Sequence, residues 1–436
     1  MDKKALQKVI LTKPSGIDWI GDIPSEWNVV PMKELFRDRK ILVGRDFEKY
    51  TLLRLSKEGV FPKQESDSGK NPAVYDAYQV FEKDDLVFCT FDYDVTPRTI
   101  GHVRQGGMLT GAYTRLIPKE AVVSRYYYYY YYALDIRKDL LHLCTGLRNA
   151  LSSHVFWNLP TTKPPKETQE KIVVFLDEKT AVVDAVIARK KRLIGLLKEK
   201  RSSIITHAVT KGLDPNAPTK PSGIDWIGDI PSNWELEKIK KYIQTRSSGL
   251  WGNDEKEDKN DITCVRVADF DYENLRVDLK NKTKRNISDN DSMKILRGGD
   301  LLLEKSGGGE KTPVGRVVLF DLDEIAICSN FVERISFRKE VDSKFFSYVF
   351  FVLHLVRINT KYIKQTTGIQ NLSLGEYFLE YIPIPSFEEQ VAISDYIENV
   401  IFETNSTIAK VERQIILLKE YRASLIYHCV TGKISV

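Results

Sequence analysis

The chain of 436 residues has few cysteines and no long apolar run. Cysteine occurs singly, without Cys-x-x-Cys spacing, at Cys89, Cys144, Cys264, Cys328 and Cys429. This usage is typical of reduced thiols in the cytoplasm and argues against a zinc site. Apolar runs stay well below the roughly 20 residues needed to span a bilayer. The opening MDKKALQKVI lacks the apolar core and cleavage site of a signal peptide. We therefore expect a cytoplasmic protein without a membrane segment.

Recognisable catalytic motifs are also lacking. GGGEKT at Gly307–Thr312 departs from the phosphate-loop pattern, since Glu310 stands where the last glycine belongs. NPAVY, starting at Asn71, lacks the second proline of a methyltransferase Asn-Pro-Pro-aromatic motif. We find no Ser/His/Asp arrangement, no paired carboxylates and no G-x-G-x-x-G after a strand. The sequence therefore predicts a non-catalytic chain that binds no cofactor or metal ion itself.

An internal repeat is the strongest signal in the sequence. TKPSGIDWIGDIPSEW at Thr12–Trp27 recurs at Thr219–Trp234 with one change, Glu26 to Asn233. Repeats of this kind decide the architecture before any secondary structure is assigned. The glycines, prolines and tryptophans of the motif favour a turn-and-aromatic clasp that seats each domain where it joins the helices described below.

Two further pairs of motifs follow the same order. P-x-x-E-x-Q occurs in PPKETQEKI from Pro164 and again in PSFEEQVAI from Pro385. TGLRN at Thr145–Asn149 is matched by TGIQN at Thr367–Asn371. Between these markers the two halves diverge almost completely, so the chain alternates variable and constant segments.

The constant segments after P-x-x-E-x-Q have the pattern of long helices. Heptad spacing joins Leu176, Val183, Lys190, Leu197 and Ile204 in the first segment, and Ile397, Thr404, Val411, Leu418 and Leu425 in the second. Gly212 and Gly432 mark their ends. About 40 residues at 1.5 Å each form a rod of roughly 60 Å. If the second helix packs beside the first, connectivity requires it to run antiparallel.

The variable segments have an α/β pattern. DDLVFCTF (Asp84–Phe91) and GDLLLEKS (Gly299–Ser306) are expected to be corresponding strands. Seven tyrosines at Tyr126–Tyr132 could stack bases, but the matching segment from Ser343 mixes aromatic and aliphatic residues. We interpret both as partly buried helices with a serine N-cap.

The expected fold is therefore two copies of an α/β (α+β) domain, separated by a pair of long antiparallel coiled-coil helices and related by a pseudo-two-fold axis. The predicted segments are a first domain at 1–165, a first spacer helix at 166–212, a second domain at 213–386 and a second spacer helix at 387–436.

Binding features are better supported than catalytic ones. The net charge of +5 permits a nucleic-acid partner without requiring one. Arg, Asn and Gln can read base edges, and the paired TGLRN and TGIQN keep their frame while Arg148 and Gln370 differ. Each basic cluster taken alone is usually just solvated surface. The candidate DNA-binding residues are Thr145, Gly146, Arg148, Asn149, Thr367, Gly368, Gln370 and Asn371, with the basic residues Arg98, Lys284, Arg285, Lys305, Lys311 and Lys364.

The doubled SGIDWIGDIPS and P-x-x-E-x-Q, each at the start of a domain or a helix, resemble the specificity (S) subunits of type I restriction–modification systems. The resemblance covers essentially the whole chain. It implies two target recognition domains, each reading one half of an asymmetric bipartite DNA site. It also implies that the helices act as a ruler, so that deleting seven residues from one helix alters the permitted spacer. Arg148→Ala or Gln370→Ala should then affect one half-site only.

The same resemblance implies protein partners. Two modification (methyltransferase) subunits would dock on the helices, and restriction (translocase/endonuclease) subunits would complete the complex. S-adenosylmethionine, ATP and Mg would be bound by those partners. The helix positions expected to contact them are Leu176, Val183, Leu197, Ile204, Ile397, Val411, Leu418 and Leu425.

Two alternatives stay open at this point. The chain could be an orphan DNA-binding scaffold detached from any methyltransferase, which genomic neighbours would reveal. It could also be a self-contained DNA methyltransferase or nuclease with unrecognised motifs. Binding of S-adenosylmethionine or cleavage of DNA by the purified chain would favour the second alternative.

Overall fold

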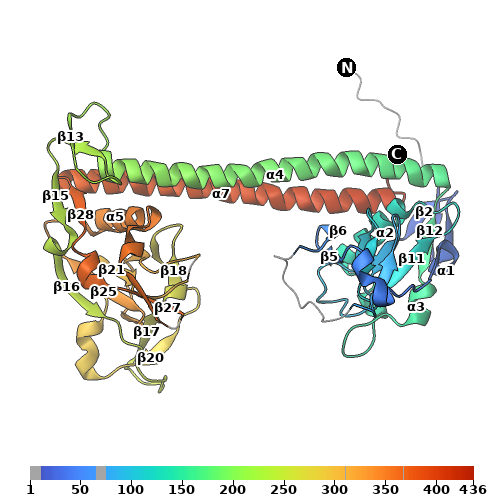
Figure 1. Cartoon of the computed structure of the whole chain (residues 1–436), viewed down its shortest axis with the longest axis horizontal. Coiled ribbons are helices and arrows are strands. Elements are labelled where there is room, and N and C mark those ends of the chain that lie inside the picture. Colours follow the sequence, from blue (N-terminus) through green and yellow to red (C-terminus); the bar gives the residue numbers. More distant parts are fainter. Residues whose placement is uncertain (1–10, 65–74, 310, 367) are drawn as a thin grey trace. The chain divides into compact units, whose positions relative to one another are not determined.

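The computed structural model describes residues 11–64, 75–309, 311–366 and 368–436. The chain forms two compact units: unit 1 is Met1–Arg189 with Arg413–Val436, and unit 2 is Lys190–Glu412. Two long helices, α4 (Lys166–Lys211) and α7 (Phe387–Val430), each contribute to both units (Figure 1). The division between the units therefore falls inside the two long helices.

Unit 1 is an α/β unit built around a four-stranded antiparallel sheet with the order β4-β11-β8-β9. The predicted strand in Asp84–Phe91 is β8 of this sheet. The strands are β1 (Thr12–Pro14), β2 (Asp22–Pro24), β3 (Asn28–Pro31), β4 (Phe36–Arg37), β5 (Leu53–Ser56), β6 (Gly59–Pro62), β7 (Gln79–Phe81), β8 (Leu86–Phe88), β9 (Ile100–His102), β10 (Gly107–Leu109), β11 (Thr114–Pro118) and β12 (Pro160–Lys163). The short helices are α1 (Met32–Leu35), α2 (Ser124–Arg137) and α3 (Ser153–Trp157).

Unit 2 is built on a larger, six-stranded sheet with the order β16-β25-β21-β23-β19-β18. The predicted strand in Gly299–Ser306 is β21 at its centre. The strands of unit 2 are β13 (Thr219–Pro221), β14 (Asp229–Pro231), β15 (Glu235–Lys238), β16 (Ile243–Ser248), β17 (Asp261–Val265), β18 (Phe270–Asp271), β19 (Arg276–Val277), β20 (Lys284–Asn286), β21 (Asp300–Glu304), β22 (Ser306–Gly307), β23 (Val317–Phe320), β24 (Ala326–Cys328), β25 (Val332–Phe337), β26 (Ile363–Thr366), β27 (Ile369–Leu372) and β28 (Tyr381–Ile384). Its helices are α5 (Ser343–Leu355) and α6 (Leu374–Tyr377).

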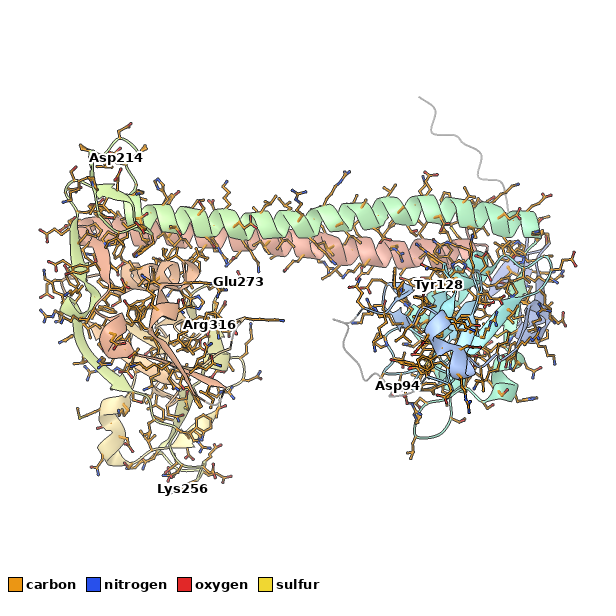
Figure 2. The ribbon with its side chains drawn as sticks, in the orientation of Figure 1. Asp94, Tyr128, Asp214, Lys256, Glu273 and Arg316 are labelled. Atoms are coloured by element: carbon orange, nitrogen blue, oxygen red, sulfur yellow. The ribbon has the colours of Figure 1, made fainter. Side chains whose placement is uncertain are left out.

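Within each unit, α4 and α7 run antiparallel, as the connectivity predicted (Figure 1). In unit 1, Nε of Arg422 on α7 lies 3.0 Å from Oδ1 of Asp184 on α4. In unit 2, Arg201 of α4 donates to Oδ1 of Asn405 on α7 over 2.6 Å. Arg201 also ties the β18–β19 turn to α4, because the Arg201 guanidinium lies 2.6 Å from the Glu273 carboxylate labelled in Figure 2.

The first copy of the repeated motif clasps the end of α7. Trp27 is buried, and a side-chain carbon added at Gly432 would lie 2.3 Å from the Pro24 ring, so the helix end is pressed against the β1–β2 hairpin. Tyr427 of α7 donates its hydroxyl proton to the carbonyl oxygen of Trp19 over 2.9 Å. The clasp expected from the sequence is thus made with the C-terminal end of a long helix.

The second copy makes the equivalent clasp in unit 2, against the end of α4. Trp234 is fully buried, and a side-chain carbon added at Gly212 would lie 3.2 Å from its ring. Lys211 of α4 donates to the carbonyl oxygen of Ile227 over 2.9 Å. Because both copies hold a helix end, their constancy follows from packing and does not require a binding role.

The glutamine of P-x-x-E-x-Q ties each long helix to the shorter helix of its unit. Gln169 is fully buried and accepts a hydrogen bond from the backbone N–H of Val123, just before α2, over 2.9 Å. Gln390 accepts in the same way from Asp342, just before α5, also over 2.9 Å. Each amide donates to the proline carbonyl five residues earlier, over 2.9 and 3.0 Å. Both ends of the amide are therefore used in fixing the helix junction.

The tyrosine run forms α2 and is mostly interior. The buried members are Tyr126, Tyr127, Tyr129, Tyr130 and Tyr131. Tyr126 donates its hydroxyl proton to the carbonyl oxygen of Val430 over 2.9 Å. The predicted serine N-cap is wrong, because Ser124 lies inside the helix and donates to the carbonyl oxygen of Asp84. A stacking platform for bases would need exposed rings, so the packed-helix interpretation holds for these five.

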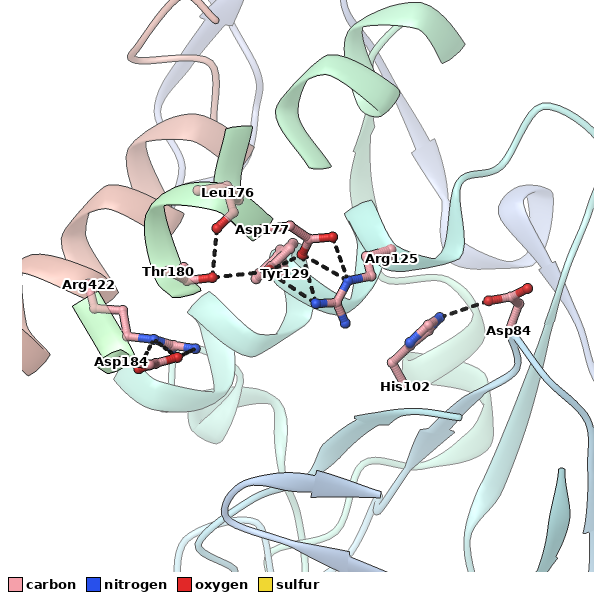
Figure 3. Close-up of polar contacts among 9 residues, drawn as sticks. All are labelled: Asp84, His102, Arg125, Tyr129, Leu176, Asp177, Thr180, Asp184 and Arg422. Carbon is pink, nitrogen blue, oxygen red and sulfur yellow. Dashed lines mark hydrogen bonds and ion pairs between the residues drawn. The ribbon is translucent and has the colours of Figure 1, made fainter. Parts of the chain in front are cut away.

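Charged and hydroxyl groups anchor α2 to α4 within unit 1 (Figure 3). Arg125 donates to both carboxylate oxygens of Asp177, over 2.7 to 3.1 Å. Tyr129 donates to the same carboxylate over 2.5 Å. These hydrogen bonds lower the pKa of Asp177 against the opposing effect of its burial. The network explains why α2 carries an arginine and tyrosines on the face that meets α4.

His102 of β9 couples the stability of unit 1 to pH. Its ring is 8% exposed, and Nε2 lies 3.2 Å from Oδ1 of Asp84 (Figure 3). Burial, aided by the nearby Arg125, lowers the pKa of His102 to about 4, while Asp84 opposes the shift. The unfolded chain, with an ordinary histidine pKa near ~6.5, binds more protons between these two values. Stability from neutral His102 is therefore complete above pH ~6.5 and is lost as the pH falls toward about 4.

We expect the free energy of unfolding of unit 1 to fall by about 3 kcal/mol across that window because of His102. Urea unfolding between pH 4.5 and 7.5, comparing the wild type with His102→Gln, isolates the contribution. The variant should show a shallower decline toward acid. If the unfolding free energy of both proteins fell equally steeply with pH, His102 would not control the acid sensitivity of unit 1.

Candidate nucleic-acid interface

The TGLRN segment of unit 1 is a tight, closed loop. Thr145 and Ala150 exchange backbone hydrogen bonds of 2.9 and 3.0 Å, and the N–H of Asn149 donates to the carbonyl of Gly146 over 3.1 Å. Gly146 has a φ of +75°, which favours glycine. The residues between Gly146 and Asn149 therefore form the tip of a turn that projects from the unit.

Arg148 at this tip is exposed yet held in place. Its guanidinium donates to both oxygens of Asp92, over 2.9 and 2.5 Å, and lies 4.6 Å from the ring centre of Phe91. Its side chain remains 65% exposed. The hydrogen bonds from Arg148 lower the pKa of Asp92, so the pair stays charged at neutral pH. Arg148 can thus approach a nucleic acid as a preoriented cation.

The TGIQN segment of unit 2 forms the hairpin of β26 and β27, beside β22. Gly307 of β22 pairs with Gln370, and Oγ of Ser306 donates to Oδ1 of Asn371 over 2.7 Å. Gly368, with a φ of +83°, lies in the turn, while Thr367 is outside the described residues. β22 and the hairpin therefore form one small three-stranded sheet with the order β22-β27-β26.

The two faces of this hairpin differ in what they can contact. Side chains alternate along β27, so Gln370 is buried while Ile369 and Asn371 are exposed. Asn371 lies opposite Lys364 in the register, which places their side chains on the same exposed face. Oε1 of Gln370 instead accepts the backbone N–H of Val314 over 3.3 Å. Gln370 therefore faces the interior of the unit, and its role as a base reader stays a prediction.

Arg98, another candidate phosphate contact, is paired and mostly buried within unit 1. Its guanidinium lies 3.0 Å from the carboxylate of Asp135, which is buried, and 4.1 Å from the ring centre of Tyr132. The Arg98 side chain is only 10% exposed. The ion pair with Asp135 ties the loop of Arg98 to α2, and its role as a phosphate contact stays a prediction.

The basic residues of unit 2 fall into two places. Lys305 lies beside the β26–β27 hairpin but pairs with Glu333 over 2.9 Å and is 19% exposed. Lys284 and Arg285 belong to β20, on a separate three-stranded sheet with β17 and β24. Arg285 lies 2.7 Å from Asp254 and stacks on the ring of Trp251 at 4.6 Å. The structure therefore does not bring β20 and the hairpin into one sheet.

Lys311 and Lys364 are the candidate cations that stay available. Lys311 lies in the turn closed by hydrogen bonds between Gly309 and Thr312, next to the hairpin. Both lysines are exposed. Within the described part of unit 2, neither has an ion pair or a side-chain hydrogen bond. They suit phosphate contacts beside the exposed face of β26 and β27.

The predicted partner-contact positions are largely buried within the chain itself. Leu176 and Ile397 are fully buried in the cores of units 1 and 2. Val183, Val411 and Leu425 are buried as well, so these five do not present a docking surface. Leu197, Ile204 and Leu418 are half-buried, and their role as partner contacts stays a prediction. The heptad stripe marks where the helices pack in the chain, and a partner would need the opposite faces.

Catalytic and membrane features add nothing to this picture. Across the described residues, no helix is long and apolar enough to cross a membrane. No group of three or more His, Cys, Asp or Glu side chains that could hold a metal ion occurs in those same residues. Asn71 and Glu310, which belong to the incomplete methyltransferase and phosphate-loop motifs, lie outside the described part of the chain.

Sequence reasoning missed three side chains at these loops. Asp92 orients Arg148, and its signal was only an acidic residue in another loop. Leu147 and Ile369 occupy the same position of TGLRN and TGIQN, and both are exposed. The signal in the sequence was the aliphatic residue at the third position of both segments.

Comparison with known families finds a match in the second half of the chain. The family model described as type I restriction modification DNA specificity domain matches residues 231–415. The type I restriction enzyme MjaVIII specificity subunit of Methanocaldococcus jannaschii is 23% identical over 292 residues, which cover 65% of this chain and 64% of that protein. The type I restriction enzyme EcoBI specificity subunit of Escherichia coli is 24% identical over 290 residues, 63% of this chain and 60% of that protein. The chain thus aligns with less than two thirds of the length of each.

Solved structures share the fold over nearly the whole chain. One chain from a structural study of assembly and conformational transition in a type I R-M system has a TM-score of 0.69 and 14% identity, and the match covers 94% of this chain and 99% of that one. The HsdS subunit from Thermoanaerobacter tengcongensis has a TM-score of 0.50 and 15% identity, covering 94% and 98%. At these identities the likeness concerns the fold: mixed α/β domains with long helices.

Proposed function

Since the chain belongs to the family of type I restriction–modification specificity subunits, we propose that it is the DNA-reading subunit of such a system. Each unit reads one half of a bipartite DNA site. Because the surfaces of the two units differ in sequence, the half-sites differ and the target is asymmetric. The long helices set the distance between the half-sites.

The observation that carries this proposal is the pair of matched loops. TGLRN in unit 1 and TGIQN in unit 2 both have a positive-φ glycine as their second residue and expose the aliphatic side chain that follows it. Around this constant frame, one unit offers Arg148 and the other offers Lys364 with Asn371. A similar loop with different neighbours is what two readers of different sequences require.

The partners follow from the same assignment. Modification (methyltransferase) subunits dock on faces of α4 and α7 that the chain leaves exposed, and restriction subunits join that complex. Exposed apolar side chains on these helices include Val174, Val182, Leu193, Leu196, Phe402, Ile416, Leu417 and Tyr421. Apolar side chains on an exposed helix face suit a helix-packing partner.

Catalysis in this proposal belongs to the partners. The chain contributes DNA recognition and docking, while the modification subunits bind S-adenosylmethionine and the restriction subunits bind ATP and Mg. The complex acts on DNA in the cytoplasm. An orphan scaffold would keep the DNA binding and lack the partners, and a self-contained enzyme would act alone.

The proposal is tested by sequencing the methylome of a host that carries this chain with its modification partner. We expect one asymmetric motif of two different half-sites separated by a fixed spacer, absent when the chain is deleted. No new methylated motif, together with sequence-specific DNA binding in vitro, would indicate an orphan scaffold. DNA methylation or cleavage by the purified chain alone would indicate the self-contained enzyme.

Arg148→Ala should weaken recognition of one half-site only. A bidentate arginine contact with a guanine discriminates by about 1–3 kcal/mol, so we expect an affinity loss of roughly tenfold or more on the cognate duplex. Arg39→Ala, at another exposed arginine of unit 1, is the matched control and should bind normally. Electrophoretic titration with duplexes altered in one half-site at a time makes the distinction. An equal loss on every duplex would mean that Arg148 contacts only phosphate.

A further inference from the structure

Leu147 is fully exposed at the tip of a rigid loop, at 106% of the reference area. The loop is fastened to the neighbouring segment, because the N–H groups of Asp92 and Tyr93 donate to the carbonyls of Arg148 and Asn149 over 2.6 and 3.3 Å. Single exposed leucines are common on protein surfaces and need no explanation. Leu147 differs from such leucines because backbone hydrogen bonds hold its turn in place. Its side chain therefore cannot fold back onto the unit to reduce its contact with water.

Ile369 occupies the matching position in unit 2. It follows Gly368 as Leu147 follows Gly146, and it is 48% exposed at the start of β27. It shares the exposed face of the hairpin with Asn371 and Lys364. An aliphatic group, an amide and a cation on one face match the apolar contact, the base edge and the phosphate of a DNA groove.

The position is constant in kind while its neighbours change. Arg148 is exposed and its counterpart Gln370 is buried, so the two loops do not use the same polar reader. Both nevertheless keep an exposed branched aliphatic residue after the turn glycine. Neither side chain belongs to a core cluster among the described residues, so packing within the chain does not account for it.

Leucine and isoleucine side chains that stand out from a DNA-binding surface can enter a groove and partly unstack a base step. Flanking cations are needed to hold the backbone while the step opens. In unit 2, Lys364 shares the exposed face of the hairpin with Ile369, and in unit 1 the exposed Arg148 directly follows Leu147.

We propose that Leu147 and Ile369 are apolar wedges, each of which inserts at one base step of the half-site that its own unit reads. The proposal rests on the DNA-reading function above and adds the contact that deforms the duplex. Specificity then includes a preference for half-sites that contain an easily unstacked step.

The test uses the complete complex of the chain with its modification partner and a duplex carrying the mapped methylation motif. 2-Aminopurine replaces the purines of the half-site read by unit 1, one at a time. On binding of the wild type, fluorescence should rise at one step. Leu147→Ala should abolish the rise in fluorescence and raise the dissociation constant roughly tenfold or more. Leu147→Met should keep the fluorescence rise and the wild-type affinity.

A mismatch at the same step provides a second measurement. It should tighten binding by the wild type, because less stacking is lost, and leave Leu147→Ala unchanged. Ile369→Ala should give the same pair of results at the other half-site. Leu42→Ala, at a leucine of unit 1 that is 56% exposed away from the loop, is the control and should behave as the wild type.

Several outcomes would overturn the wedge. These are an unchanged affinity for Leu147→Ala, no fluorescence change with the wild type, or an equal loss of binding on scrambled duplexes. Failure of the underlying function is distinguishable from all of them, because the wild-type complex would then bind motif and scrambled duplexes equally.

Discussion

Deleting one heptad from each long helix is expected to end methylation at the original target and to select a site with a shorter spacer. The deletion removes residues 189–195 from α4 and 411–417 from α7. Seven residues at 1.5 Å each shorten the pair by about 10 Å, close to the length of three base pairs of duplex. We expect an affinity loss of about 100-fold or more at the original site, since the two half-sites can no longer be contacted together.

The choice of segments follows from the observed pairing of the helices. Asp184 pairs with Arg422 in unit 1, and Arg201 with Asn405 in unit 2, and both contacts lie outside the deletion. A whole heptad preserves the apolar register, so Val183 is followed by Leu197 and Thr404 by Leu418 at the same positions of the stripe. If the heptad were removed from one helix alone, seven residues of the other helix would lose their packing partners. A change of spacer could then come from the shorter length or from the lost packing.

Methylome sequencing of hosts carrying the wild type or the shortened chain measures the spacer directly. A control that keeps the length, Arg192→Ala with Glu412→Ala at two exposed positions, should leave the motif unchanged. The helices would not be a ruler if the shortened chain methylated the original motif with its original spacer.

Much of the fold could be predicted because it rests on repetition and periodicity. The sequence predicts helix packing from the heptad stripe of α4 and α7. It predicts two equivalent packing sites from the two copies of the tryptophan motif. Buried Trp27 and Trp234 and the paired Gln169 and Gln390 show those requirements met twice. Where the units divide could not be read from the motifs, because a continuous helix shared by two cores gives no signal at the boundary.

The binding loops were found by their matched frame, but the roles within them were not. Whether a residue of a short strand faces the core or solvent changes at every position, so Gln370 and Ile369 exchange roles on a shift of one residue. The ion pair of Arg98 could not be predicted for a related reason, since its partner Asp135 lies on a different element. Charge alone therefore indicates a basic residue without indicating whether it is already neutralised.

Trp234→Ala is expected to cost unit 2 about 3–5 kcal/mol of unfolding free energy, the range for removing a fully buried large aromatic side chain. Trp234 lies in the main core of unit 2 with Ile205, Ala208 and Val209 of α4. Its removal would leave a cavity where the repeated motif meets the helix end beside Gly212. Urea unfolding of the full chain measures the loss as a shift in the transition midpoint of unit 2.

Two substitutions of the same motif separate packing from other causes. Trp234→Phe should lose much less, because Nε1 of Trp234 makes no hydrogen bond in the described part of the chain and most of the ring volume is kept. Trp226→Ala, at a half-buried tryptophan of the same motif, should also cost less than Trp234→Ala. Trp27→Ala should shift the transition of unit 1 instead, because Trp27 belongs to that core. If Trp234→Ala were as stable as the wild type, the repeated motif would not be a structural clasp, and its constancy would need a binding role after all.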